Sequence, residues 1–217
     1  MTRRRVQHSI ERSCAASSAQ KDREANEQTL STARVDELWR AARKLGLARP
    51  NIRLLTDMIA CPGGDFCSLA NARSLPLAEA ITARYHDLDE LHDLGEIDLH
   101  ISGCINSCGH HHSGHIGILG VDKDGKEWYQ ITLGGSDGSA LSGEPAPGKV
   151  VGPSFSAAEV PEVIEAVLDT YRTHRQTDGD KAETFIATLR RLGLEPFKAA
   201  ANAARFANAQ AASAQAA

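Results

Sequence analysis

The sequence predicts an α+β domain over about residues 30–198. Stretches with the helical period of apolar residues and stretches with the strand period occur in turn along this range, separated by glycine and proline turn signals. The chain has 217 residues, of which 41% are hydrophobic and 24% are charged, so it is long enough for a real core and has an ordinary globular composition.

Apolar residues recur with the helical period in four stretches: 35–45, 76–95, 156–171 and 180–192. Pro76 suits the first turn of the second helix, because a helix start leaves backbone N–H groups unpaired anyway. Ser156 and Glu159 form a capping box at the start of the third helix. Gly95 and Gly193 stand where the second and the last helix are expected to end.

Three strands are expected between the helices. Residues 97–102 alternate apolar and polar side chains, which indicates a half-buried strand. Residues 115–121 and 126–133 are expected to form a hairpin, because the segment Asp122–Gly125 between them has the composition of a tight turn.

The two ends of the chain differ in composition from the predicted domain. Residues 1–29 are polar and show no helical or strand period, so we expect a disordered or non-native leader there. Residues 199–217 contain 12 alanines among 19 residues, and we expect this tail to favour a helix but to fray.

Charge and hydropathy exclude several classes of protein. A formal net charge of −4 gives no reason to expect a nucleic-acid binder. No apolar run approaches the ~20 residues that a membrane helix needs, and the basic start lacks the apolar segment of a signal peptide. Five cysteines are too few for a secreted disulfide scaffold of this length. The sequence therefore predicts a protein that binds neither nucleic acid nor membrane, and we expect it in the cytoplasm, because reduced thiolates suit a reducing compartment.

Four of the five cysteines form two close pairs in glycine-rich loops. Cys61 and Cys67 make a C-x5-C loop after a segment that could form a strand, and Cys104 and Cys108 make a C-x3-C loop after the strand at 97–102. Loops at the ends of rigid elements commonly carry cofactor ligands. The glycines beside these thiols allow tight turns and bring amide N–H groups close to a bulky anion. We assign no role to Cys14.

Three interpretations of the cysteine pairs follow from spacing alone. Four thiolates in such loops suit an iron–sulfur cluster, whose sulfur atoms accept N–H hydrogen bonds. A structural zinc site usually spaces its ligands as C-x2–4-C, which fits the second pair and not the first. The cysteines could also be buried structural residues, although loops rich in glycine and proline are poor places for a core.

The short sequence motifs around the cysteines resemble those of the sirohaem-dependent nitrite/sulfite reductase family. C-x5-C is followed some 36 residues later by C-x3-C, with Ala60-Cys61-Pro62-Gly63 and Asn106-Ser107-Cys108-Gly109 as flanks. Further matching words are Ile101-Ser102-Gly103-Cys104, Gly114-His115-Ile116-Gly117, Leu133-Gly134-Gly135 and Gly193-Leu194-Glu195-Pro196-Phe197. The resemblance covers about residues 33–200. Ile105 stands where many relatives have proline, a position that supplies no ligand.

The resemblance implies a fold, cofactors and a reaction. The fold would be a mixed or antiparallel sheet flanked by helices. Cys61, Cys67, Cys104 and Cys108 would each bind one iron of a [4Fe–4S] cluster, and Cys108 would also be axial to the iron of sirohaem. Asn106 could donate to either cofactor or could simply be a turn residue. The reaction would be the six-electron reduction of sulfite to sulfide or of nitrite to ammonia in an assimilatory enzyme.

The implied partners are sulfite or nitrite, and reduced ferredoxin or an NADPH-dependent flavoprotein as electron donor. Family members carry an upstream region that supplies much of the sirohaem pocket, so we expect this chain to lack an N-terminal half and to be a fragment with little activity of its own. We assign no catalytic acid or substrate-binding base to this chain, because the upstream region of family members supplies the basic residues that contact the substrate. The alternatives are a stand-alone [4Fe–4S] electron-transfer protein and a zinc-stabilised binding module.

Other candidate residues surround the cysteine loops. We expect His110, His111, His112 and His115 to serve packing, contact with the haem edge or solvation rather than metal binding. Arg49, Arg53 and Arg73 could pair with sirohaem carboxylates, although each taken singly is better explained as surface charge.

Overall fold

A computed structural model describes residues 32–139, 142–179 and 181–215, with side-chain packing described between Arg34 and Arg205. The predicted leader at 1–29 lies outside the described residues. The chain divides into two compact units at Pro50, whereas the sequence placed the start of the domain at residue 30. In the first unit, helix α2 (Thr32–Lys44) confirms the first predicted helix, and Arg40 pairs with Asp36 one turn away.

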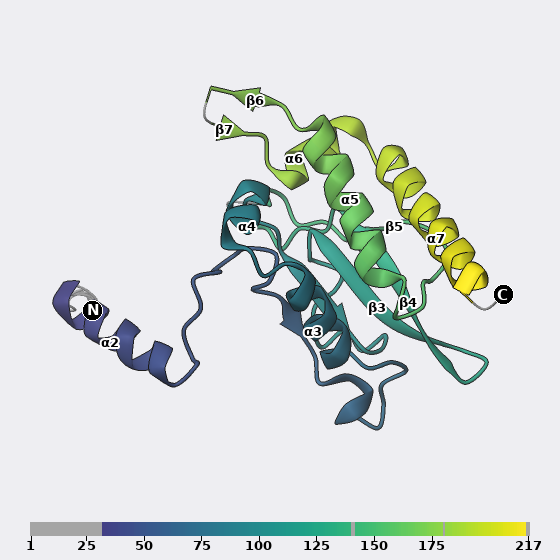
Figure 1. Cartoon of the computed structure of the whole chain (residues 1–217), viewed down its shortest axis with the longest axis horizontal. Helices are drawn as coiled ribbons and strands as arrows, with labels where there is room; N and C mark the ends of the chain where they lie inside the picture. The colour runs from purple at the N-terminus through teal and green to yellow at the C-terminus, as the bar shows by residue number, and fades with distance from the viewer. Residues whose placement is uncertain (1–31, 140–141, 180, 216–217) are drawn as a thin grey trace, which may run out of the picture. The chain divides into compact units, whose positions relative to one another are not determined.

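The second unit is built on a five-stranded mixed sheet with the order β1-β2-β3-β4-β5. The strands are β1 (Ile59–Ala60), β2 (Leu99–Ser102), β3 (Ile116–Lys123), β4 (Lys126–Leu133) and β5 (Lys149–Val150). The first three are parallel neighbours, and the last three are antiparallel neighbours. The predicted α+β class with a mixed sheet and flanking helices is confirmed (Figure 1).

The predicted hairpin is confirmed, although its first strand continues two residues further than expected, to Lys123. Lys123 pairs with Lys126 at its closed end, so the loop is Asp124-Gly125, and both residues have positive φ angles of 56° and 74°. This is the conformation that matches the natural twist of two strands joined by a two-residue loop.

The prediction for β2 is wrong in one respect, because all four of its residues are buried. Hydrogen-bonded strands lie on both sides of β2, and both of its faces are covered. His100 and Ser102, whose alternation with apolar residues suggested a solvent-facing side, are therefore interior residues. A strand that lies between two parallel neighbours usually has both faces covered, and so it has no solvent-exposed face.

The second predicted helix is two helices, α3 (Leu75–Arg84) and α4 (Leu88–Leu94). Tyr85 ends the first, and Asp87 begins the second by accepting a hydrogen bond from the backbone N–H of Asp89 through its side chain. A good N-cap within an apolar stretch stops one helix and starts another, which the apolar pattern alone does not reveal.

The core lies between the sheet and helix α5 (Val160–His174), which crosses the sheet with α7 (Glu195–Gln215) beside it (Figure 1). The predicted apolar face of α5 is buried: Val160, Val163, Ile164, Val167, Leu168 and Tyr171. The capping box forms only in part: the Ser156 backbone N–H and hydroxyl both donate to the Glu159 carboxylate, but α5 begins three residues later than predicted, with Glu159 as its N-cap residue and no side-chain cap bond. Helix α7 starts before the predicted tail boundary and buries Phe197 and Ala201.

The last predicted helix starts later than expected. Strands β6 (Thr177–Asp178) and β7 (Lys181–Ala182) form a short antiparallel pair where the helix was expected to begin. Helix α6 (Phe185–Leu192) follows, with Thr184 accepting from the N–H of Ala187 as its cap. Gly193 ends it as predicted, with φ of 76°. Among the described residues, no helix is both long and apolar enough to cross a membrane.

Candidate cofactor site

The two cysteine loops leave the sheet at the same edge. Strands β1 and β2 are parallel, with Ala60 paired to Ile101, and the backbone N–H of Cys61 extends this pairing by donating to the carbonyl of Ile101 at 3.0 Å. Cys61 follows β1 directly, and Cys104 lies two residues beyond β2. The sheet therefore brings together cysteines that are 43 positions apart in sequence (104 − 61).

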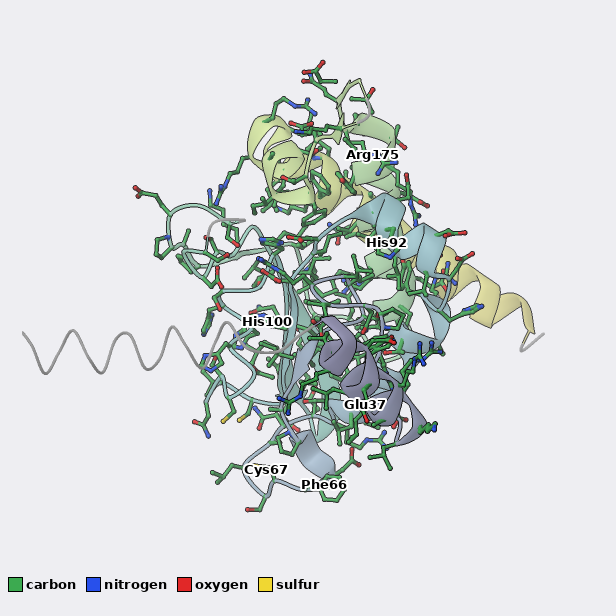
Figure 2. All side chains as sticks on the ribbon, turned by 90° about the vertical axis from the view of Figure 1, so that its left-hand side faces the viewer. Glu37, Phe66, Cys67, His92, His100 and Arg175 are labelled. Atoms are coloured by element: carbon green, nitrogen blue, oxygen red, sulfur yellow. The ribbon has the colours of Figure 1, made fainter. Side chains whose placement is uncertain are left out.

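The first loop turns on a short 3-10 segment, η1 (Gly63–Asp65). Cys67 closes the turn by donating its N–H to the carbonyl of Gly63 at 2.9 Å. Gly63 has a φ of 64°, and a Cβ atom there would lie 2.3 Å from the backbone nitrogen of Ser74. Only glycine fits such a position. Phe66 and Cys67 lie together on this loop (Figure 2), with the Phe66 ring 79% exposed.

Gly103 joins the second loop to the first. Its carbonyl accepts hydrogen bonds from the N–H groups of Asn71 and Ala72, at 2.8 and 3.1 Å. Its own N–H donates to the sulfur of Cys61 at 3.1 Å. A Cβ atom at Gly103 would lie 2.7 Å from the carbonyl oxygen of Ala72 and 2.9 Å from the Cα of Gly63. The absence of a side chain at Gly103 therefore allows the backbones of the two cysteine loops to come into close contact.

The second loop is a series of tight turns that carries Cys104 and Cys108. Ser107 donates its N–H to the carbonyl of Cys104 and has a positive φ of 56°. Gly109 donates its N–H to the buried hydroxyl of Ser102 at 3.1 Å. Cys104 is buried, whereas Cys108 is exposed and so accessible to a further ligand. Asn106 is exposed between them.

The histidines near the second loop differ in burial. His111 and His115 are buried, whereas His110 and His112 are exposed. Burial, with a smaller contribution from His112, lowers the pKa of His111 to about 4, so its ring is neutral near pH 7 and hydrogen-bonds the Ser107 hydroxyl through Nδ1 at 3.1 Å. Burial also lowers the pKa of His115, whose Nε2 lies 2.9 Å from the Ser142 hydroxyl. These contacts agree with the predicted packing role for the two buried rings.

Of the three arginines considered for sirohaem carboxylates, Arg53 and Arg73 have protein partners, and Arg49 is exposed. Arg73 forms a forked pair with Glu127, with Nη2 2.6 Å from Oε1. Arg53 lies 3.6 Å from a carboxylate oxygen of Glu96. Surface ion pairing is therefore the structural role of both side chains.

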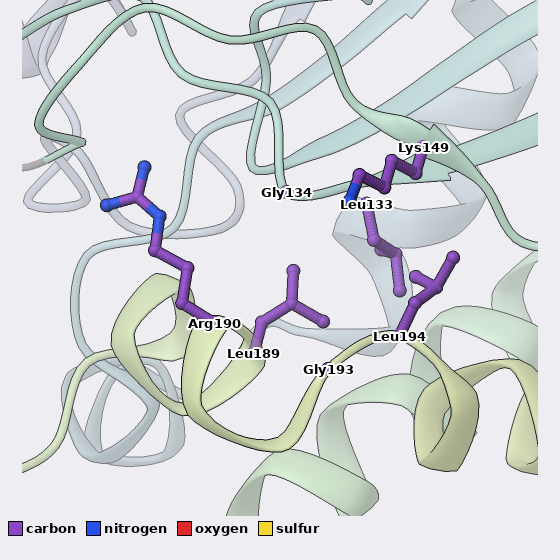
Figure 3. A pocket seen from close by; sticks show the side chains of 7 residues that line it. All are labelled: Leu133, Gly134, Lys149, Leu189, Arg190, Gly193 and Leu194. Carbon is purple, nitrogen blue, oxygen red and sulfur yellow. The ribbon is translucent and has the colours of Figure 1, made fainter.

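The sequence analysis did not predict a small pocket of about 220 Å³, which is lined by residues outside the two cysteine loops. Figure 3 shows leucine side chains between the cationic side chains of Arg190 and Lys149. Its lining comes from β4, β5, and α6 with the turn after it: Leu133, Gly134, Lys149, Leu189, Arg190, Gly193 and Leu194. Leu133 and Gly134 belong to one of the family motifs quoted above, and Gly193 and Leu194 to another, but separate motifs do not show that their residues share a pocket.

A sequence model of the family described as "Nitrite and sulphite reductase 4Fe-4S domain" matches residues 53–208. The chain belongs to this family. An assimilatory ferredoxin-dependent nitrite reductase of Haloferax mediterranei is 32% identical over 124 residues, covering 54% of this chain and 20% of that protein. Sulfite reductase (ferredoxin) 1 of Mycolicibacterium paratuberculosis is 32% identical over 114 residues, covering 48% of this chain and 20% of that protein. The chain thus spans about a fifth of the length of these two relatives.

Two solved structures have a fold similar to that of this chain. The NirA protein of Mycobacterium tuberculosis superimposes with a TM-score of 0.59 at 25% identity, covering 76% of this chain and 31% of that one. Dissimilatory sulfite reductase I gives a TM-score of 0.53 at 15% identity, covering 65% of this chain and 51% of that one, and this likeness concerns the fold alone. Family membership supports the predicted cofactors, a [4Fe–4S] cluster and sirohaem.

The four cysteines of the two loops are suited to bind a [4Fe–4S] cluster. Cys61, Cys67, Cys104 and Cys108 are all free thiols, and an N–H and an O–H group lie within hydrogen-bond distance of the Cys61 sulfur. Donors directed at sulfur are typical of cluster ligands. Within the described part of the chain, no three Cys, His, Asp or Glu side chains are grouped as a single metal ion requires. A cluster does not need that grouping, because each thiolate binds a different iron.

Proposed function

We propose that this chain is the cluster- and sirohaem-binding part of a nitrite or sulfite reductase. The parallel pairing of β1 and β2 is the observation that supports this most, because it brings two glycine-lined cysteine loops to one edge of the sheet. Family membership supplies the cofactor class to which this geometry is suited.

The proposed ligands of the [4Fe–4S] cluster are Cys61, Cys67, Cys104 and Cys108. Cys108 is proposed to be shared with the sirohaem iron, and its exposure supports this, because a shared sulfur must be reachable from outside the loop. When bound, the two cofactors would pass six electrons, taken one at a time from the electron donor, to a small oxyanion. The chain would hold the four thiolates on its two loops, and it places hydrogen-bond donors against the sulfur of Cys61. Asn106 is a proposed contact of the cofactors because it is exposed between Cys104 and Cys108.

The proposed substrate is sulfite or nitrite, and the proposed donor is reduced ferredoxin. The names of the two relatives include one enzyme for each substrate, and both names refer to ferredoxin. An NADPH-dependent flavoprotein remains an alternative donor. We propose a reducing compartment such as the cytoplasm, which suits free thiols and an iron–sulfur cluster. Because the chain matches only a fifth of those relatives, the complete reaction is proposed for the protein to which such a domain contributes.

The decisive experiment is cofactor analysis of the full chain, expressed anaerobically with sirohaem synthesis available. We expect about four cluster irons and one haem iron per chain, with matching acid-labile sulfide. Cys108→Ser should lose the haem and weaken the cluster, whereas Cys14→Ser is the matched control that should keep both. Cluster without haem would mean that this chain does not by itself bind sirohaem. A colourless protein with one zinc ion would overturn the proposal.

A further inference from the structure

Ser74 stands at a position where serine normally caps a helix, but its side chain does not do so. It is the N-cap residue of α3, and its carbonyl accepts the first helical hydrogen bond, from the N–H of Ala78 at 3.0 Å. Serine is favoured at such positions because its hydroxyl can accept from the free N–H groups of the first turn. The Ser74 side chain makes no cap bond of this kind.

The Ser74 hydroxyl instead lies 3.4 Å from the sulfur of Cys61. Ser74 is completely buried, and no buried side-chain oxygen or nitrogen in the described ranges lacks a hydrogen bond. A cysteine that ligates iron is a thiolate and can only accept, so the hydroxyl must be the donor. Together with the N–H of Gly103 at 3.1 Å, it gives the Cys61 sulfur two donors.

Two glycines leave the space that this hydroxyl occupies. A Cβ atom at Gly63 would lie 2.8 Å from the Ser74 oxygen, and a Cβ atom at Gly103 would lie 3.1 Å from it. The oxygen is therefore enclosed between the two cysteine loops, where its orientation toward sulfur is fixed by packing. The contact between Ser74 and Cys61 could not be predicted from the sequence, because Ser74 lies 13 positions after Cys61 and at the start of another element.

We propose that Ser74 is a positioning residue that sets the reduction potential of the cluster by donating its hydroxyl hydrogen bond to Cys61. This inference rests on the proposed ligand set. One-electron reduction adds a negative charge to the cluster, and a donor to a ligand sulfur stabilises the more negative state more strongly. The Ser74 hydroxyl therefore raises the potential, and it retains its proton throughout.

The test is an anaerobic redox titration of the cluster-loaded full chain, followed by the electron paramagnetic resonance signal of the reduced cluster. Ser74→Ala should shift the midpoint potential to a more negative value at unchanged iron content. Ser74→Thr, which keeps the hydroxyl, should restore the potential toward the wild-type value. Ser156→Ala is the matched control, because it removes a serine hydroxyl at the start of α5 that bonds Glu159 and not sulfur. That variant should lose stability and keep the potential.

The outcomes separate this inference from the proposed function. A loaded Ser74→Ala protein with the wild-type potential would overturn the role of Ser74 and leave the ligand set intact. A wild-type chain that binds no cluster would overturn the proposed function, and this inference with it. If Ser74→Ala does not fold, Ser74→Gly removes the same hydroxyl with a residue that is tolerated at an N-cap, and the same negative shift is expected.

Discussion

Replacing Gly103 by alanine should separate the two cysteine loops, because the added Cβ atom has no space. It would lie 2.7 Å from the carbonyl oxygen of Ala72 and 2.9 Å from the Cα of Gly63, and both of these are backbone atoms that cannot rotate away. Overpacking of this kind costs about 1–3 kcal/mol. The shift also strains the three hydrogen bonds that Gly103 makes to Cys61, Asn71 and Ala72, each worth about 1 kcal/mol.

We therefore expect Gly103→Ala to lower the free energy of unfolding by about 2–4 kcal/mol, a large part of the ~5–15 kcal/mol that stabilises a typical domain. Urea unfolding of the metal-free chain under reducing conditions measures this, and the midpoint should fall by about 1–2 M. Iron retained after cluster loading should fall as well, since the loops no longer hold the thiolates together.

Gly64→Ala, in the first cysteine loop, is the matched control. Its Cβ atom would approach the flexible side chain of Arg73, with the nearest atom 3.3 Å away. We expect this variant to cost less than about 1 kcal/mol, because a side chain can move where a backbone cannot. If Gly103→Ala were no less stable than Gly64→Ala, the close contact between the loops would not be what requires glycine.

Three further predictions test the packing and electrostatics of the second unit. Tyr85→Phe removes the hydroxyl that donates to Glu165 and should cost about 1.5 kcal/mol in urea unfolding, since two arginines still satisfy that carboxylate; an unchanged midpoint would contradict this. Burial lowers the pKa of His111 to about 4, so the unfolded chain binds more protons below about pH 6.5 and stability should fall by roughly 2 kcal/mol between pH 7 and pH 5. His111→Gln should reduce that pH dependence, and an equal slope would refute the buried neutral ring. Leu168→Ala, in the core face of α5, should cost about 2–5 kcal/mol, whereas Leu69→Ala at an exposed position should stay within about 0.5 kcal/mol.

Local sequence signals predicted the elements that depend on neighbouring residues. The composition of Asp122–Gly125 predicted the hairpin, because aspartate and glycine tolerate the positive φ angles that Asp124 and Gly125 adopt in its loop. The apolar face of α5 was predictable because a helix repeats its apolar pattern over several turns. The same signals were insufficient between α3 and α4, where the cap at Asp87 interrupts an apolar pattern that suggested one helix.

The two cysteine pairs, the glycines beside them and the hairpin could be recognised before the fold was known, because each is encoded within a few consecutive residues. Three features required the folded chain: the parallel pairing of β1 with β2, the interior positions of His100 and Ser102, and the contact of the Ser74 hydroxyl with sulfur in place of a helix cap. The physical reason is distance along the chain. The contact between Gly103 and Cys61 joins residues 42 positions apart, and a contact of that kind forms only when the sheet has brought both strands together.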